Sequence, residues 1–183
     1  MVASQSQPLN ERDLETLARI AAAQKTDTIE LALDAARERL GMDAAYVTTH
    51  TPDTQSIDQV SGDSSALGFG AGTVVAIEKT FCHRMLKGEL PNVVPDTRAE
   101  PAARELGASV LIGAYAGVPI TLADGRVHGT LCCASSQPRT DLGAEELEFM
   151  RVLAKMVGAR IDKIEADQAA AVDRGRSTRI DTM

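Results

Sequence analysis

The sequence predicts an α+β fold, in which an antiparallel sheet is built around a β-hairpin with helices before and after it in the chain. Two almost uncharged runs, 110–121 and 127–136, enclose Asp124-Gly125, and an Asp-Gly pair between strand-like runs is a strong hairpin signal. Both runs are rich in β-branched, aromatic and small residues, which is typical of central strands buried on both faces. Segments with apolar residues at helical spacing lie on either side of the hairpin in the chain.

Three glycines and a proline interrupt the two runs. Gly113, Gly117 and Gly129 each weaken a strand, so we expect a helix or a ligand to approach the backbone closely there. Pro119 has no N–H to donate to a sheet ladder, which predicts a bulge or an edge position.

The first part of the chain predicts two helices, two strands and a loop. Residues 1–8 read as a disordered lead-in, whereas apolar side chains recur at helical spacing from Leu9. A second helix begins at the capping box Asp27–Glu30 and ends at Gly41. We expect strands at 44–49 and 56–61, and a mobile glycine- and serine-rich loop at 62–72.

The elements around the hairpin follow from the same signals. Apolar residues three and four positions apart predict a helix over 73–86 that ends at Gly88. The two prolines of 91–95 favour an extended segment, and a short helix is expected at 100–106. After the hairpin, Thr140 or Asp141 caps a long helix with a stripe close to a heptad. We therefore assign one domain to residues 9–166, and expect 167–183 to fray or to act as a linker or tail.

Bulk properties exclude several classes of partner. The 183 residues have a formal net charge of −7, and the basic residues are spread singly, so we expect no nucleic-acid partner. No segment is long and apolar enough to span a bilayer, and the N-terminus has no signal-peptide core, so we expect no membrane partner. Three cysteines without a secretion signal indicate reduced thiols and a cytoplasmic location.

Four segments resemble the GAF domain family. They are KTFCHRML at 79–86, NVVPDT at 92–97, IGAYAGVPI at 112–120 and HGTLCCAS at 128–135, followed by an amphipathic helix. The likeness spans about residues 71 to 164 and is closest to GAF sensors of bacterial signalling proteins, which are often joined to cyclic-dinucleotide enzymes, histidine kinases or phosphatases. It implies α/β/α layers: a central antiparallel sheet with the terminal helices on one face and a ligand pocket on the other.

The resemblance implies a non-enzymatic sensory or regulatory module. We expect a cytoplasmic homodimer that binds an unknown small molecule and signals through its terminal helices to an output domain or partner protein. Two alternatives stay open: a thiol-based redox sensor or an enzyme like the free-methionine-sulfoxide reductases, and a ligand-free dimerisation scaffold. The sequence names no cofactor and has no His or Cys spacing that supports a metal site.

The pair Cys82-His83 is the first candidate for chemistry in the chain. A neighbouring thiol and imidazole could form a reactive thiolate, a metal site or a chromophore attachment point. The opposing interpretation packs Cys82 in the core while His83 faces outward. In bilin-binding GAF domains a Cys-His pair comes shortly before the strand that corresponds to 112–120, but here the preceding segment has no cysteine, which argues against a covalent bilin.

Cys132 and Cys133 are neighbours on a predicted strand, so their side chains point to opposite faces of the sheet. One of them could meet Cys82 in space, as a redox pair or a metal site, or all could be small buried hydrophobic residues. In the sulfoxide reductases three cysteines cluster closely in sequence, whereas about 50 positions separate Cys82 from Cys132, so that enzyme matches poorly.

Four further residues are candidates for polar or aromatic contacts in the pocket. Asp96, Thr97 and Arg98 follow an extended segment where a GAF pocket has polar groups, although Asp96 could instead close a turn. Tyr115 suits a pocket or a core equally. His50 and His128 look isolated in the sequence.

Seven apolar residues of the terminal helices are candidates for a dimer contact. The stripe of the last helix could pack partly against a partner's equivalent helix, or wholly on its own sheet, and both interpretations stay open. The candidates are Leu14, Leu17, Met150, Leu153, Val157, Ile161 and Ile164.

Overall fold

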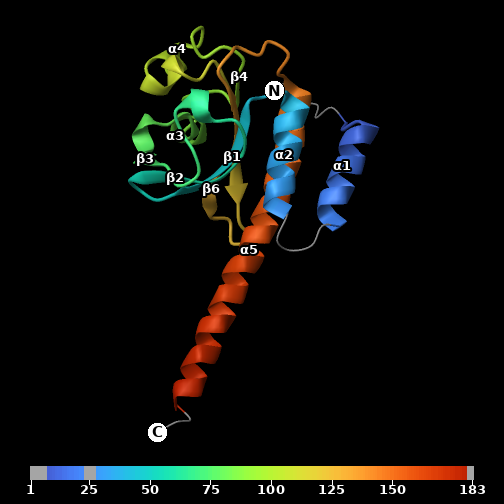
Figure 1. Ribbon diagram of the computed structural model, residues 1–183, viewed down its shortest axis with the longest axis vertical. Helices are drawn as coiled ribbons and strands as arrows, with labels where there is room; N and C mark the ends of the chain where they lie inside the picture. Colours follow the sequence, from blue (N-terminus) through green and yellow to red (C-terminus); the bar gives the residue numbers. More distant parts are fainter. Residues whose placement is uncertain (1–7, 23–27, 181–183) are drawn as a thin grey trace, which may run out of the picture.

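The computed structural model describes residues 8–22 and 28–180 and confirms the predicted α+β fold (Figure 1). Its six-stranded sheet has the order β3-β2-β1-β6-β5-β4, and every neighbouring pair is antiparallel. The strands are β1 (Ala44–His50), β2 (Thr54–Gly62), β3 (Val74–Ala76), β4 (Val93–Val94), β5 (Ala114–Thr121) and β6 (Val127–Ser135).

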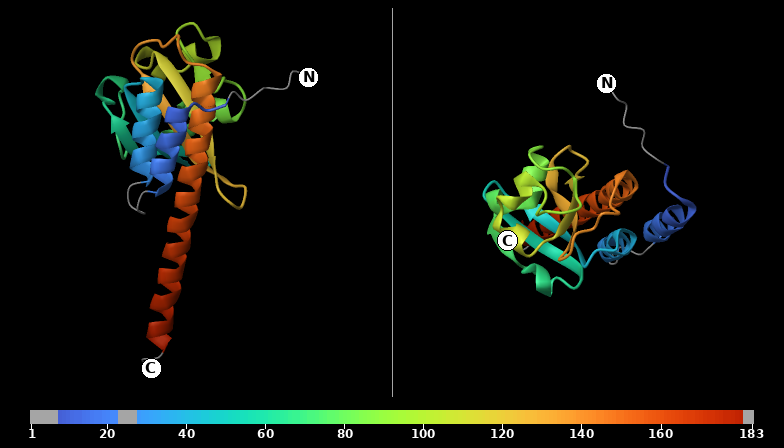
Figure 2. Two further views of the ribbon diagram at one scale, coloured as in Figure 1. Left: turned by 90° about the vertical axis from the view of Figure 1, so that its right-hand side faces the viewer. Right: turned by 90° about the horizontal axis from the view of Figure 1, so that it is seen from above.

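Helices cover both faces of the sheet. The helix face, as we call it, packs against α2 (Thr28–Leu40) and α5 (Ala144–Ile180), and α1 (Glu11–Ala22) lies on the outer side of these two (Figure 2). The opposite side, the far face, lies under α3 (Phe81–Leu86), α4 (Pro101–Arg104) and three 3-10 turns at Ser65–Leu67, Ile77–Lys79 and Gly107–Val110. The chain therefore has the three layers that the resemblance implies.

The hairpin of β5 and β6 supplies both layers of the core. Alternate residues of β5 point to opposite faces, because side chains in a strand repeat every two positions. Ala116, Val118 and Ile120 join the cluster under α2 and α5, whereas Tyr115 joins the cluster on the far face. Both strands are buried along most of their length, as the uncharged runs predict.

Pro119 occupies the edge position that its missing N–H requires. Strand β4 pairs with β5 at Tyr115 and Ala116 and does not extend to Pro119, while the register between β5 and β6 shifts after Ile120. The three glycines mark close approaches, but the expected helix or ligand is wrong. A Cβ atom at Gly113 would meet the backbone of Ser136, one at Gly129 the backbone of Thr48, and one at Gly117 the Tyr115 hydroxyl.

The helix predicted over 73–86 is wrong in its first half. Val74 and Val75 belong to β3, which pairs with β2, and a 3-10 turn follows before α3 begins at Phe81. Thr80 divides the segment because its backbone is extended and its hydroxyl oxygen accepts the His83 N–H, which caps α3. The β-branched valines favour the strand, although their spacing also fits a helix.

The C-terminal segment is also more regular than expected. The predicted fraying at Asp167 is wrong, since α5 continues as one helix to Ile180, whereas the linker or tail role of 167–183 stays a prediction. Residues 166–177 are exposed, and the helix projects away from the rest of the molecule (Figure 1). Alanine, arginine and glutamine in this segment favour helix even without tertiary contacts. The expected lead-in at 1–7 and the cap at Asp27 lie outside the described residues.

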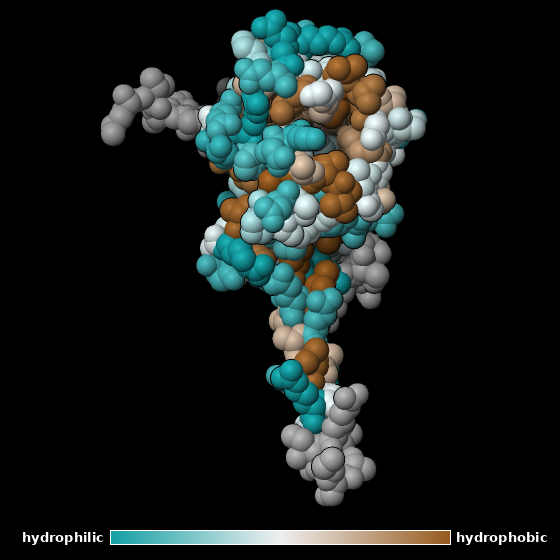
Figure 3. Space-filling view, turned by 90° about the vertical axis from the view of Figure 1, so that its left-hand side faces the viewer, coloured by the Kyte–Doolittle hydropathy of each residue, from teal (hydrophilic) through white to brown (hydrophobic). Residues whose placement is uncertain are grey.

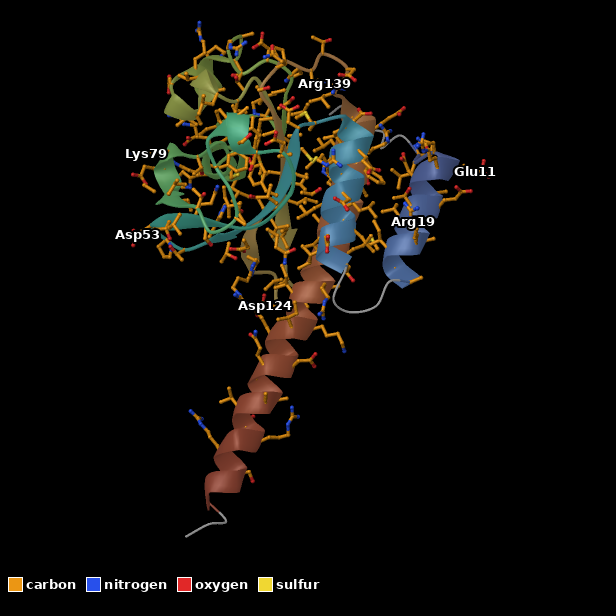
Figure 4. All side chains as sticks on the ribbon, in the orientation of Figure 1. Glu11, Arg19, Asp53, Lys79, Asp124 and Arg139 are labelled. Atoms are coloured by element: carbon orange, nitrogen blue, oxygen red, sulfur yellow. The ribbon has the colours of Figure 1, made fainter. Side chains whose placement is uncertain are left out.

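The turn between β5 and β6 contacts α5 where this helix leaves the sheet. The Ala123 N–H donates to an Asp162 carboxylate oxygen at 2.9 Å, and Arg126 forms an ion pair with Glu165 at 2.9 Å. Figure 4 places the neighbouring Asp124 beside α5 at this point. Among the described residues no helix has both the length and the apolar character needed to cross a bilayer.

Candidate functional site

Three of the seven predicted ligand-binding residues meet on the far face. Cys82 comes from α3, Tyr115 from β5 and Cys132 from β6, and their exposed fractions are 1%, 0% and 0%. The two Sγ atoms lie 3.3 Å apart, and no disulfide joins them. The Tyr115 hydroxyl lies 3.5 Å from the Cys82 Sγ atom and 3.4 Å from the Cys132 Sγ atom. These three residues are called the thiol cluster below.

The local sequence explains why these groups can meet. The glycine at 117 leaves room for the Tyr115 hydroxyl, which would otherwise collide with a Cβ atom two residues along the same face of β5. The ring of Tyr115 contacts that of Phe81, with centroids 5.4 Å apart, and so places the start of α3 over the sheet. Cys133 lies in the core of the helix face, which confirms that the two adjacent cysteines point to opposite sides.

A row of polar side chains links the thiol cluster to a half-buried histidine. The Cys132 thiol donates to the Thr130 hydroxyl at 3.2 Å, and this oxygen lies 2.7 Å from the Thr48 hydroxyl. The Thr48 hydroxyl lies 3.1 Å from His50 Nε2, which is also 3.1 Å from Gln55 Oε1. Thr48, Gln55 and Thr130 are buried.

Sequence analysis missed this polar row. His50 looked isolated because Gln55 lies on the neighbouring strand β2 and Thr130, which continues the row beyond Thr48, lies on β6. Only the pairing of β1 with β2 and β6 brings these residues together. His128 is not isolated either, since its Nε2 atom lies 3.0 Å from the Thr49 hydroxyl.

The surroundings make the two thiols of the cluster chemically unequal. The hydrogen bond with Cys132 lowers the pKa of the Cys82 thiol well below its ordinary value. Hydrogen bonds from His50 and Thr130 also lower this pKa, whereas burial raises it. Burial raises the pKa of the Cys132 thiol, and it also raises that of the Tyr115 hydroxyl. Cys82 is therefore the more acidic thiol, and the pKa of Cys133 is raised by burial on the other face.

The other four ligand-binding candidates lie apart from the thiol cluster. Thr97 is buried and its hydroxyl donates to the Ile112 carbonyl, while an Asp96 carboxylate oxygen accepts the Arg98 N–H at 2.9 Å. Arg98 is exposed, and His83 is half-buried on α3. The side chains of Asp96 and Thr97 thus satisfy nearby backbone groups, and their role toward a ligand stays a prediction.

The far face, where the resemblance implies a pocket, is occupied by a second cluster of buried side chains, which includes Tyr46, Leu67 and Met85 besides the thiol cluster. A small molecule on this face would have to displace some of them. The outer surface over these elements carries apolar patches (Figure 3), and Val110 and Leu111 are exposed there. A hollow of about 960 Å³ lies elsewhere, between α1 and α2.

The dimer candidates divide into two groups. Leu17, Met150, Leu153, Val157 and Ile161 are buried in the core of the helix face, so they are not free to contact a second chain. Leu14 is 55% exposed and Ile164 is half-buried on α5. A dimer role stays a prediction for these two.

Comparisons with known proteins place the fold in one family. The sequence profile of the GAF domain matches residues 25–161. No curated protein matches the chain by sequence.

Several solved structures share the fold. The GAF domain of an Acinetobacter phosphoenolpyruvate-protein phosphotransferase has a TM-score of 0.67 at 14% identity, over 86% of this chain and 97% of that one. The chromophore-binding domain of an unusual bacteriophytochrome from R. palustris has a TM-score of 0.68 at 16% identity, over 88% of this chain and 66% of that one. The phycoerythrobilin-bound GAF domain of a cyanobacterial phytochrome has a TM-score of 0.64 at 18% identity, over 88% of this chain and 100% of that one. The profile match covers most of the chain and the architecture agrees with it, so this chain belongs to the GAF domain family.

Proposed function

We propose that this GAF domain is a sensory or regulatory module that passes an event on the far face of its sheet to α5, within a homodimer. The continuity of α5 is the observation that supports this proposal. Its first half is buried against the sheet at Met150, Leu153 and Val157, and the same helix continues beyond the body to Ile180. A rigid element that joins the core to a projecting end can transmit a small shift without any other connection.

The route from the far face to α5 is short. Strand β6 contains Cys132 on the far face and Cys133 on the helix face, so displacement of this strand affects both cores. The turn after β5 then contacts α5 through Asp162 and Glu165. Signalling requires that the stimulus favours one arrangement of α5 over another, because an equal effect on both arrangements would transmit nothing.

The homodimer is proposed from apolar side chains that the chain's own core leaves uncovered. Val172 is 56% exposed on the projecting part of α5, and Ile164 is half-buried eight residues earlier on the same helix. Residues at this spacing can contribute to one face of a helix. Pairing of two α5 helices would bury both side chains and place the projecting ends side by side.

Native mass spectrometry and sedimentation equilibrium of the full chain test this proposal. We expect a dimer at micromolar concentration, and association at least about 100-fold weaker after the paired substitutions Ile164→Glu and Val172→Glu, because each buried aliphatic side chain contributes about 1.5–3 kcal/mol. Lys163→Glu is the control, since it changes the net charge by the same amount at an exposed neighbouring position. A wild-type chain that is monomeric at 100-fold higher concentration, or a double variant that dimerises normally, would contradict the proposed dimer.

A further inference from the structure

We propose that Cys82 and Cys132 are the two halves of a reversible disulfide, and that the far face of this domain responds to a hydroperoxide. The inference names the stimulus of the proposed function and depends on that function only for the output. The thiols come from positions that are 50 residues apart in the sequence, yet their Sγ atoms lie 3.3 Å apart. The two sulfurs must approach to about 2 Å to form the bond.

The geometry gives each sulfur a different role. The Tyr115 hydroxyl donates to the Cys82 Sγ atom at 3.5 Å, which favours the Cys82 thiolate, and the thiolate is the nucleophilic form of cysteine. Cys132 lies beside it with a thiol that donates to Thr130, so it can act as the resolving group. Cys133 is next to Cys132 in the sequence but lies on the helix face, and among the described residues its thiol has no hydrogen-bond partner.

His50 positions a proton at the edge of the cluster. The Oε1 atom of Gln55 lies 3.1 Å from His50 Nε2, and this carbonyl oxygen selects the tautomer that carries its proton on Nε2. The Thr48 hydroxyl lies 3.1 Å from the same Nε2 atom and continues the row through Thr130 to Cys132. His50 therefore acts as a positioning residue that stabilises negative charge on the thiols from the half-buried end of the row.

The reaction balances with one hydroperoxide. The Cys82 sulfur attacks one peroxide oxygen, the O–O bond breaks, and the thiol proton ends on the departing oxygen, which leaves a sulfenic acid and one water or alcohol. The Cys132 sulfur then attacks the Cys82 sulfur, the S–O bond breaks, and the Cys132 proton ends on the departing hydroxide as a second water. Two thiols are oxidised by two electrons and the peroxide is reduced by two. A dithiol reductant restores the original state.

Mass spectrometry of the full chain after treatment with hydrogen peroxide tests the site. We expect non-reduced peptides joined between Cys82 and Cys132, with the loss of two hydrogen atoms, and recovery of free thiols after a dithiol reductant. The matched control is Cys133→Ala, which should form the same bond. Cys132→Ser should stop at a sulfenic acid on Cys82 that a dimedone probe captures, and Cys82→Ser should form no bond. Circular dichroism confirms that each variant is folded.

The rate of oxidation tests the contribution of His50. Substitution His50→Leu removes the donor and should slow disulfide formation about tenfold, because a hydrogen bond that favours the charged thiolate is lost. His50→Gln restores a donor and should recover most of the rate, while His128→Leu should leave it unchanged. An equal rate in His50→Leu would remove His50 from the proposal.

Two results would overturn the disulfide itself: thiols that stay free under peroxide concentrations that oxidise a folded dithiol standard, or a bond that involves Cys133. A disulfide that forms while α5 and the dimer stay unchanged would contradict the proposed function instead. Failure of the site and failure of the output are therefore distinguishable.

Discussion

Replacing Leu153 by alanine is expected to lower the free energy of unfolding by about 2–5 kcal/mol, because a buried leucine loses both its transfer free energy and its packing contacts. Leu153 is fully buried on α5, in the cluster that joins this helix to β5 and α2. Strand β5, on which α5 packs, pairs with β6 along its whole length and with β4 at Tyr115 and Ala116, so it cannot collapse easily into the space left behind. Chemical denaturation followed by circular dichroism measures the effect.

The control for this substitution lies two residues along the same helix. Lys155 is exposed, and Lys155→Ala should change the free energy of unfolding by less than about 0.5 kcal/mol. A loss below about 1 kcal/mol for Leu153→Ala would show that α5 does not form the centre of the core, and the assignment of α5 as the transmitting element would then fail.

Substitution Arg39→Met is expected to release α1 and to lower the free energy of unfolding by about 2–3 kcal/mol, since a charge-assisted hydrogen bond contributes about 1.5–3 kcal/mol. The Arg39 guanidinium lies 2.9 Å from an Asp13 carboxylate oxygen on α1 and 2.6 Å from a Glu146 oxygen on α5. Asp13 is almost fully buried, so loss of Arg39 leaves the Asp13 carboxylate without its cation and with the Glu146 carboxylate nearby.

Hydrogen exchange over 11–22 separates this local effect from global unfolding. We expect faster exchange in α1 of the Arg39→Met chain than in α2 or the sheet. Arg39→Lys keeps the charge but loses the planar guanidinium. We expect its α1 to exchange faster than in the wild-type chain and more slowly than in the Arg39→Met chain. Arg12→Met, at an exposed position of α1, is the control. Unchanged protection of α1 in Arg39→Met would show that apolar contacts of Leu17 and Ile20 suffice to hold the helix.

The hairpin, the α+β class and the order of the elements other than β3 could be predicted from the sequence because each depends on local signals. Asp124-Gly125 defines the turn, and the two flanking runs have strand composition. The prediction of one helix over 73–86 failed because apolar spacing alone cannot distinguish one long helix from a short β-branched strand that is followed by a capped helix. The prediction of where α5 ends failed for a different reason. The exposed end of this helix has no apolar stripe, and it is helical because its residues have a high intrinsic helix propensity.

The candidate site could be predicted only in part. That one of the adjacent cysteines might face Cys82 follows from strand alternation, and the structure brings Cys82 and Cys132 together. The row of Thr48, His50 and Thr130 could not be predicted, because it depends on the lateral register of β1 against β6 and on the shift between Val47 and Thr48. Side chains that meet across strands leave no mark in the spacing of a single sequence.

The structure also limits how a stimulus can act on this domain. The far face contains packed side chains around the thiol cluster, so a chemical change between two sulfurs requires less displacement than entry of a large ligand. The same strand that holds Cys132 continues into the turn that contacts α5. In the proposed function, contraction of the far-face core is passed along β6 to the point at which α5 leaves the sheet.

Hydrogen exchange of α5 in the reduced and the peroxide-treated chain tests most directly whether the far face controls this helix. We predict that treatment changes the exchange of residues 156–170, next to the contacts at Asp162 and Glu165, in the wild-type chain and in Cys133→Ala but not in Cys82→Ser. Identical exchange in reduced and fully disulfide-bonded wild-type chains would contradict a connection between the thiol cluster and α5.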